Sequence, residues 1–286
     1  MSGAGEGIER GTVEVEGVRT FFQRTPGSGV PTVFVHGNPT NGDDWLPFMR
    51  ELEGPAIAPD LPGWGRSERP DYASFDGTMN GLAGHLERFL EVMEVGEYNL
   101  VTHDWGSVGL IAAQRHTERV QRLVALNCVP LTGEYRWHWI ARRFWRRRGL
   151  GEAFNLGART PVGRSALRLV SRQATARPGP IPEELVERAV RHWDAGTGRA
   201  ILRLYRSADP AELAAAGARR AELACRALVL WAGADPYIPA RFGGELAGAL
   251  PDATLVELPD AGHWPWVERP DVVPTVARFL EGSDST

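Results

Sequence analysis

The chain alternates between short apolar runs and longer amphipathic stretches. Two runs of β-branched and aromatic residues, Thr12 to Val15 and Val18 to Phe22, are joined by Glu16 and Gly17 and predict an opening hairpin. The apolar runs that follow lack polar residues at alternate positions, which is typical of strands buried on both faces. They lie at residues 32–35, 56–58, 98–101 and 123–126, and the same rhythm returns at residues 227–231 and 254–258.

Helical patterns separate these runs. From Met79 to Met93, apolar residues recur at intervals of three and four and form one stripe along a helix. Further helices are expected from about Pro239 and around residues 272–280. Because strands and helices alternate, we predict an α/β protein with a mostly parallel sheet and helices on both faces.

The alternation stops between about Leu131 and Arg220, where the chain carries arginine, tryptophan and helix formers without a convincing strand. We therefore predict a helical cap domain over residues 131–220, inserted into a core domain of residues 1–130 and 221–286. The stretch RPGPIP at residues 177–182 predicts a rigid break between the two halves of the cap. The first half has five arginines between residues 142 and 148, and we interpret them as a solvated cap face rather than a nucleic-acid site.

Composition places limits on partners and location. The net charge of -4 and the pI of about 6.0 give the whole chain no general attraction to nucleic acid or to an anionic membrane. No run approaches the roughly 18 apolar residues of a membrane span, and the start lacks the pattern of a signal peptide. Cys128 and Cys225 are far apart and fit reduced thiols. We expect a cytoplasmic protein.

One stretch departs from a familiar pattern. In NLVTHDWGSVGL, residues 99–110, an apolar strand leads through a sharp turn into a helix, and such turns often hold a serine within G-x-S-x-G. Asp104 occupies the central position, and Thr102 and Gly106 supply the small residues on either side. Ser107 falls inside the predicted helix and is badly aimed, which argues against a serine hydrolase.

Five motifs in order resemble the α/β-hydrolase superfamily, and within it the branch with an aspartate nucleophile, which contains epoxide hydrolases and haloalkane dehalogenases. They are HGNPT (36–40), DLPGWGRS (60–67), HDWGS (103–107), GADPYIP (233–239) and DAGHWPWVERPD (260–271), and they extend over nearly the whole chain. A carboxylate is ionised at neutral pH and can attack a saturated carbon that bears an epoxide oxygen or a halogen. The product would be an alkyl ester on Asp104, which water must then hydrolyse.

That hydrolysis needs a general base, and His263 is the candidate. The order nucleophile, acid, histidine is the order that this fold uses. Asp235 follows the predicted strand 227–231, so its carboxylate would emerge at the same sheet edge and could orient the imidazole. The resemblance also implies that the backbone N–H groups of Asn38 and Trp105 stabilise the charge that grows on Asp104.

Epoxide hydrolases and haloalkane dehalogenases differ in the leaving group that the site must stabilise. The side chains of Asn38 and Trp105 would offer N–H donors to a halide, and HGNPT followed by HDW resembles haloalkane dehalogenases. Tyr205 lies 30 residues before Asp235 and resembles the second ring-opening tyrosine of epoxide hydrolases. Tyr135 and His138 are both candidates for the first cap donor, and the sequence leaves that choice open.

We predict an epoxide hydrolase that converts a small apolar epoxide and water into a vicinal diol. A haloalkane dehalogenase with the same triad is the alternative, and a non-catalytic binding protein of the same fold is the alternative of another class. A fluoroacetate-type dehalogenase is disfavoured, because Trp105 stands where that family is expected to have an arginine. We expect no metal or organic cofactor, no nucleic-acid or membrane partner, and a monomer or homodimer.

Overall fold

The structure, a computed structural model, describes residues 7–165, 174–176 and 183–283, and these residues contain an eight-stranded sheet. The strand order is β1-β2-β4-β3-β5-β6-β7-β8. β2 runs antiparallel to β1 and β4, and the remaining neighbours are parallel, as in the predicted mostly parallel sheet. The strands are β1 (Glu9–Val15), β2 (Val18–Thr25), β3 (Thr32–Val35), β4 (Ala56–Pro59), β5 (Tyr98–Asp104), β6 (Val120–Cys128), β7 (Arg226–Ala232) and β8 (Ala253–Leu258).

The predicted hairpin is confirmed and is longer than expected. Val15 pairs with Val18 across the turn. The two turn residues both have positive φ, 49° at Glu16 and 80° at Gly17. Such a two-residue turn matches the right-handed twist of the strands that it joins.

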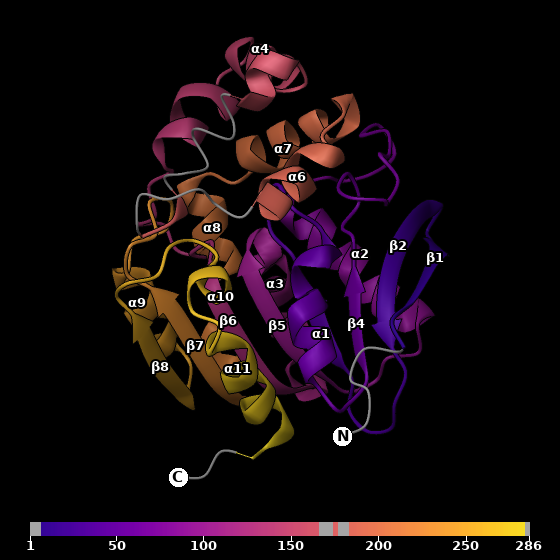
Figure 1. Ribbon diagram of the computed structural model, residues 1–286, viewed down its shortest axis with the longest axis vertical. Helices are drawn as coiled ribbons and strands as arrows, with labels where there is room; N and C mark the ends of the chain where they lie inside the picture. Colours follow the sequence, from indigo (N-terminus) through magenta and orange to yellow (C-terminus); the bar gives the residue numbers. More distant parts are fainter. Residues whose placement is uncertain (1–6, 166–173, 177–182, 284–286) are drawn as a thin grey trace.

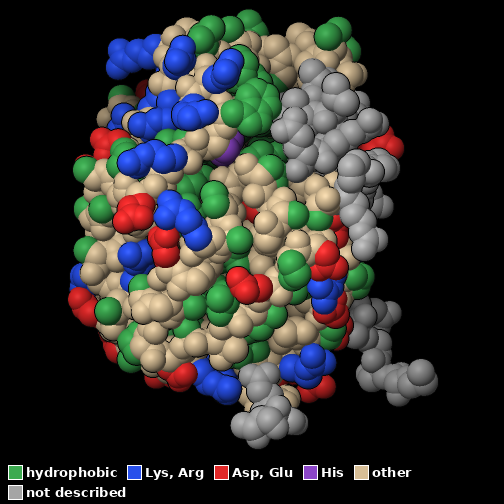
Figure 2. Space-filling view, turned by 90° about the vertical axis from the view of Figure 1, so that its left-hand side faces the viewer, with side chains coloured by type: hydrophobic (Ala, Val, Ile, Leu, Met, Phe, Trp, Pro, Cys, Tyr) green, Lys and Arg blue, Asp and Glu red, His purple; other side chains and the backbone are tan. Residues whose placement is uncertain are grey.

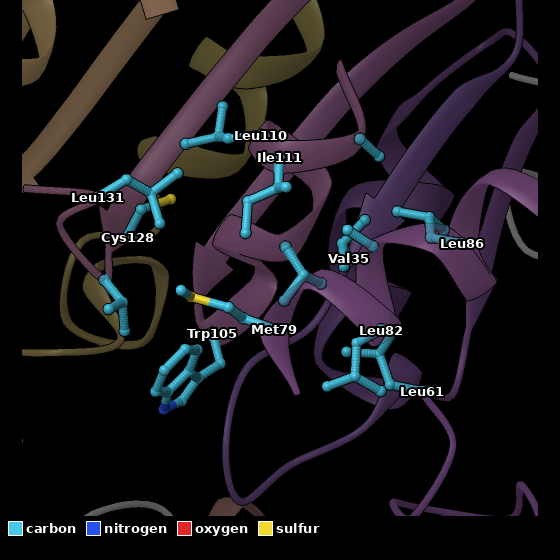
Figure 3. Packing of buried hydrophobic residues seen from close by; sticks show 14 of the residues in the cluster. Val35, Leu61, Met79, Leu82, Leu86, Trp105, Leu110, Ile111, Cys128 and Leu131 are labelled. Carbon is cyan, nitrogen blue, oxygen red and sulfur yellow. The ribbon is translucent and has the colours of Figure 1, made fainter. Parts of the chain in front are cut away.

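Helices cover both faces of the sheet. This explains why the strands lack polar residues at alternate positions. All seven residues of β5 are buried. Leu100 packs in one hydrophobic cluster with Met79 and Leu82, whereas Val101 packs in the other cluster with Phe48. Successive side chains of a strand point to opposite faces, so each face must be apolar. Figure 3 shows part of the first cluster around Val35, Met79 and Leu82.

Two groups of helices provide this cover (Figure 1). One face carries α2 (Met79–Val92), α3 (Val108–Arg115) and α9 (Arg241–Ala249). The other face carries α1 (Leu46–Glu51), α10 (Pro265–Glu268) and α11 (Val272–Glu281). Short 3₁₀ turns complete the layers: η1 (Gly42–Trp45), η2 (Trp105–Ser107), η3 (Thr117–Arg119) and η6 (Arg220–Glu222). The helices predicted for residues 79–93, from about Pro239 and around residues 272–280 are confirmed as α2, α9 and α11.

The described part of the segment between β6 and β7 contains helices joined by irregular stretches, and no strand. It contains the π-helix η4 (Ala141–Trp145), followed by α4 (Leu150–Ala158), α6 (Glu183–Arg191), α7 (Ala195–Ser207) and α8 (Pro210–Ala216). In Figure 1, α4, α6 and α7 lie beyond one end of the sheet, while α8 lies beside the sheet layers. The Gln114 amide of α3 donates to the carbonyl of Ala216 at 3.0 Å. The division at residues 131 and 220 stays a prediction, and the stretch at 177–182 lies outside the described residues.

A search of the described residues finds no helix with the length and apolar character that crossing a membrane requires.

Candidate active site

Asp104 is the last residue of β5 and directly precedes η2, so it lies where the strand turns into the helical segment. Its φ of 50° and ψ of -122° are unusual for a residue with a side chain, and such strain is common at reactive positions. Two glycines make room for it. A Cβ atom on Gly37 would lie 2.5 Å from the Asp104 Cβ, and one on Gly106 would lie 2.1 Å from the carbonyl oxygen of Val35. The bend can therefore approach β3 closely.

The Asp104 carboxylate is held by backbone donors. Its Oδ2 accepts the backbone N–H of Asn38 at 2.7 Å, and the backbone N–H of Trp105 also stabilises its charge. Burial nevertheless raises the pKa of Asp104 to about 6, against the lowering effects of His263 and these two N–H groups. The two donors that the family resemblance implied thus interact with the carboxylate on which charge would grow.

His263 lies between two carboxylates, and its side chain is 3% exposed. Its Nδ1 is 2.7 Å from Oδ2 of Asp235, and its Nε2 is 3.8 Å from Oδ1 of Asp104. Burial lowers the pKa of His263, but the charge and hydrogen bond of Asp235 outweigh it, so the pKa is raised above its usual value. The imidazole is oriented by Asp235 and faces Asp104 without a hydrogen bond to it. This arrangement suits a base that receives a proton from a third molecule.

Asp235 is fixed by contacts that sequence reasoning missed. The side-chain amide of Asn127, near the end of β6, donates to its Oδ2 at 2.8 Å, and the Asn127 Oδ1 accepts the backbone N–H of Ala232 at 2.9 Å. The backbone N–H groups of Tyr237 and Ile238 donate to its Oδ1 at 2.7 and 3.1 Å. A polar residue at the end of an otherwise apolar strand was the available signal, since such ends meet at one sheet edge.

A cavity lies between Asp104 and His263 on one side and the helical segment on the other. Core residues Asn38, Asp104 and His263 line it together with mostly aromatic and aliphatic side chains. Those side chains include Trp137, Ile140, Trp145, Phe154, Leu185, Trp193 and Tyr237. Because few polar groups converge in an apolar enclosure, the cavity is suited to a small apolar molecule.

Tyr205 of α7 lines the same cavity and is 3% exposed. Its ring meets Trp105 edge to face, with centroids 5.2 Å apart, and its hydroxyl interacts with the side chains of Trp105 and Asn38. Burial, reinforced by the charge of Asp104, raises the Tyr205 pKa well above its usual value. Tyr205 therefore holds its proton beside Asp104.

The side chains of Asn38 and Trp105, which lie next to Tyr205, have few other hydrogen-bond partners. The Asn38 Oδ1 accepts the indole N–H of Trp64 at 3.1 Å, which leaves the Asn38 NH₂ group for other partners. The indole nitrogen of Trp105 is buried and makes no hydrogen bond of good geometry among the described residues. In Figure 3 this nitrogen is turned away from the hydrophobic cluster.

Both candidates for the first cap donor line the cavity. The Tyr135 hydroxyl donates to the carbonyl of Tyr237 at 3.1 Å, so its proton is already engaged. The Nδ1 of His138 has no partner among the described residues, and burial lowers the pKa of His138 to about 3. His138 is therefore a neutral imidazole that could hold a substrate oxygen. The choice between the two stays a prediction.

The contacts of His36 and Ser107 indicate structural roles rather than roles in the reaction. The His36 Nδ1 donates to the Gly37 carbonyl at 2.8 Å, while its Nε2 accepts the N–H of Leu61 at 2.9 Å. These bonds use both ring nitrogens of His36 within the turn, so His36 shapes the backbone there. Ser107 is fully buried and is absent from the cavity lining. In the described part of the chain, no three His, Cys, Asp or Glu side chains are grouped as a metal site would need.

The mostly parallel sheet with helices on both faces, together with this site, is typical of α/β hydrolases. A comparison with known protein families agrees. The sequence pattern of the Alpha/beta hydrolase family matches residues 32–274, and the chain belongs to this family. The resemblance inferred from the five motifs is thereby confirmed.

Curated relatives carry different names. A cis-3-alkyl-4-alkyloxetan-2-one decarboxylase from Shewanella oneidensis is 39% identical over 109 residues, 35% of this chain and 33% of that protein. A haloalkane dehalogenase from Sphingobium indicum is 35% identical over 132 residues, 44% of either protein. These matches span less than half of the relatives. A second such decarboxylase, from Xanthomonas campestris, is 29% identical over 92% of both chains.

Solved structures share the fold over nearly the full length. A haloalkane dehalogenase from Bradyrhizobium elkani is similar with a TM-score of 0.79 and 25% identity, covering 96% of this chain and 98% of that one. The epoxide hydrolase CorEH has a TM-score of 0.78 and 21% identity, covering 96% and 99%. At that identity the second likeness concerns the fold alone. Haloalkane dehalogenases belong to the aspartate-nucleophile branch that the motifs resemble.

Proposed function

We propose that the protein is an epoxide hydrolase that works through an ester on Asp104. An Asp104 oxygen attacks one epoxide carbon, the carbon–oxygen bond of the ring breaks, and Tyr205 gives its proton to the departing oxygen. His263 then takes a proton from water, and the resulting hydroxide attacks the Asp104 carbonyl carbon. The ester bond breaks, the alcohol oxygen takes a proton from His263, and a vicinal diol leaves. The proton that remains on the Asp104 carboxyl returns to the Tyr205 oxygen, which restores the ionised carboxylate and the neutral phenol.

The observation that carries this proposal is the position of Tyr205. Its hydroxyl interacts with the side chains of Asn38 and Trp105, the two donors that a halide would require. A neutral phenol in this position can protonate an alkoxide, whose basicity exceeds that of phenolate. The raised pKa of Tyr205 agrees with a group that keeps its proton until the ring opens.

Dehalogenation of a haloalkane is the second candidate. It is favoured by the Trp105 indole N–H, which lacks a good hydrogen bond, and by the relatives that are named haloalkane dehalogenases. A halide would then have to displace the Tyr205 hydroxyl from Asn38 and Trp105. Opening of an oxetan-2-one is a third candidate, favoured by the match with the Xanthomonas relative over 92% of the chain.

A substrate comparison distinguishes the three candidates. The purified protein is incubated with styrene oxide, with 1-bromobutane and with a cis-3,4-dialkyloxetan-2-one, and diol, bromide and carbon dioxide are measured separately. We expect diol formation to be the fastest reaction. Bromide or carbon dioxide release without diol would replace the proposal with the corresponding alternative, and inactivity toward all three would favour a binding protein.

Replacing Tyr205 with phenylalanine should slow ester formation from styrene oxide by about 10²-fold, because the departing oxygen loses its proton donor. Ester formation from 1-bromobutane should change much less, since bromide needs no proton. Rapid-quench measurement of the first turnover reports this step. Tyr98→Phe, at a buried tyrosine away from the cavity, is the matched control. Equal slowing with both substrates would rule out proton donation by Tyr205.

The rate of ester formation should fall as the pH drops through about 6, because burial raises the pKa of Asp104 to that value and a protonated carboxyl cannot attack. In the His263→Gln protein this acid limb should move to higher pH, since the charge of His263 lowers the Asp104 pKa. The measurement is the first-turnover rate between pH 4 and 9. A limb near the usual carboxyl value of about 4 would contradict the raised pKa.

A further inference from the structure

The apolar side chains on the surface are concentrated in one segment. The large hydrophobic residues that are exposed among the described residues are Val30, Val92, Trp139, Leu150, Leu156 and Val162. Four of these six lie between residues 139 and 162, and they include the two most exposed, Leu156 at 64% and Val162 at 80%. Scattered single apolar residues are normal on a protein surface, but a local concentration marks a contact surface.

The same segment is strongly basic. Between residues 139 and 165 there are seven arginines and one acid, Glu152, in a chain whose net charge is -4. Glu152 is paired with Arg206 at 2.8 Å. Six of the arginines are exposed and make no ion pair among the described residues: Arg142, Arg143, Arg147, Arg148, Arg159 and Arg164. Figure 2 shows arginine side chains gathered in the upper part of the molecule, next to hydrophobic ones.

These two features define what we call the cap surface: Leu150, Leu156, Val162 and the six exposed arginines. We propose that the cap surface docks on anionic lipid bilayers. Guanidinium groups can bind lipid phosphates while aliphatic side chains enter the interface, and this combination is typical of proteins that lie on a membrane. A nucleic-acid partner fits less well, because the exposed leucine and valine side chains would gain nothing from a phosphate backbone.

The remainder of the chain must be acidic, since the whole chain is negative while this segment is positive. An anionic surface would therefore attract the cap surface and repel other parts, which orients the protein. The inner sides of the same elements line the cavity, through Trp145 of η4 and Phe154 of α4. If the proposed function holds, docking places the cavity next to a source of apolar substrates. Docking itself does not depend on that function.

Vesicle sedimentation tests the proposal with the full-length protein and no substrate. Vesicles of equal parts phosphatidylglycerol and phosphatidylcholine should bind the protein, and pure phosphatidylcholine vesicles should bind it at least about tenfold more weakly. The double variant Arg147→Glu/Arg148→Glu should lose at least about tenfold in affinity for the mixed vesicles. Leu156→Ser/Val162→Ser should also weaken binding severalfold.

The controls have the same chemical changes elsewhere. Arg10→Glu/Arg50→Glu reverses two exposed arginines outside the cap surface and so alters net charge equally. Val92→Ser removes a side chain that is 47% exposed on α2. Both should bind the mixed vesicles like the parent, and circular dichroism should show that every variant is folded.

Several outcomes would overturn the proposal. These are failure of the parent to bind mixed vesicles, equal binding to pure phosphatidylcholine, or equal loss in the control variants. Release from mixed vesicles by a short RNA duplex at concentrations below those of the lipid phosphate would assign the surface to nucleic acid instead. Loss of styrene oxide turnover has no bearing on these readings, so failure of the proposed function is recognised separately.

Discussion

The Asp104→Ala protein is expected to have no measurable turnover, with a loss of at least about 10⁵-fold in kcat/KM for styrene oxide. The chemical reason is that the variant lacks the oxygen that bonds to the substrate carbon, while the cavity and the imidazole are unchanged. Other groups at the site cannot take over the attack. Ser107 is fully buried, does not line the cavity, and is the last residue of η2.

Ser107→Ala is therefore the informative partner experiment. We expect it to retain nearly full activity, because its hydroxyl takes no part in the reaction.

Isotope labelling adds a direct reading: a single turnover in H₂¹⁸O should put the label into Asp104 rather than into the diol, since water attacks the carbonyl carbon of the ester. Label found only in the diol, or substantial activity in Asp104→Ala, would exclude the ester mechanism.

The His263→Gln protein is expected to stop after the first step. Asp104 can still attack, but no base removes a proton from water, so the ester should accumulate and turnover should fall by about 10³-fold. Mass spectrometry of the intact protein should show an increase equal to one substrate molecule, and digestion should place it on the peptide that contains Asp104.

The double variant Asp104→Ala/His263→Gln should show no such adduct, and His116→Gln should turn over like the parent, since His116 is a partly exposed histidine outside the cavity. An adduct that survives in the double variant would place the covalent bond on another residue. If His263→Gln gave neither adduct nor loss of turnover, the imidazole would have no role in ester hydrolysis.

Much of the architecture could be predicted because burial imposes a pattern on single segments. Residues 32–35 form β3 with the predicted bounds, and both faces of that strand are covered. β5 and β6 extend further than their apolar cores suggested, because pairing with parallel neighbours continues through Thr102 and Cys128, whose side chains contact each other across the two strands. Local hydrophobicity does not report those partners.

Some residues of the candidate site could also be predicted from the sequence, whereas others depend on the tertiary structure. Asp104, Asp235 and His263 lie in recognisable motifs, and in parallel strands the positions after the strand ends converge at one edge. The bond from Asn127 to Asp235 joins residues 108 positions apart, and it depends on β6 lying next to β7. The placement of Tyr205 against Trp105 and Asn38 depends on how α7 packs over the sheet.

The sequence by itself determined the α/β class and the order of the strands along the chain, and it proposed the three residues that the structure brings together at the centre of the candidate site. It could do so because buried strands require apolar runs and because sharp turns with reactive side chains require particular neighbours. Only the tertiary structure decided that Tyr205 lies against Trp105 and that Asn127 holds Asp235. Those relations arise from packing between segments distant in the chain, and a one-dimensional pattern carries no record of distances across the fold.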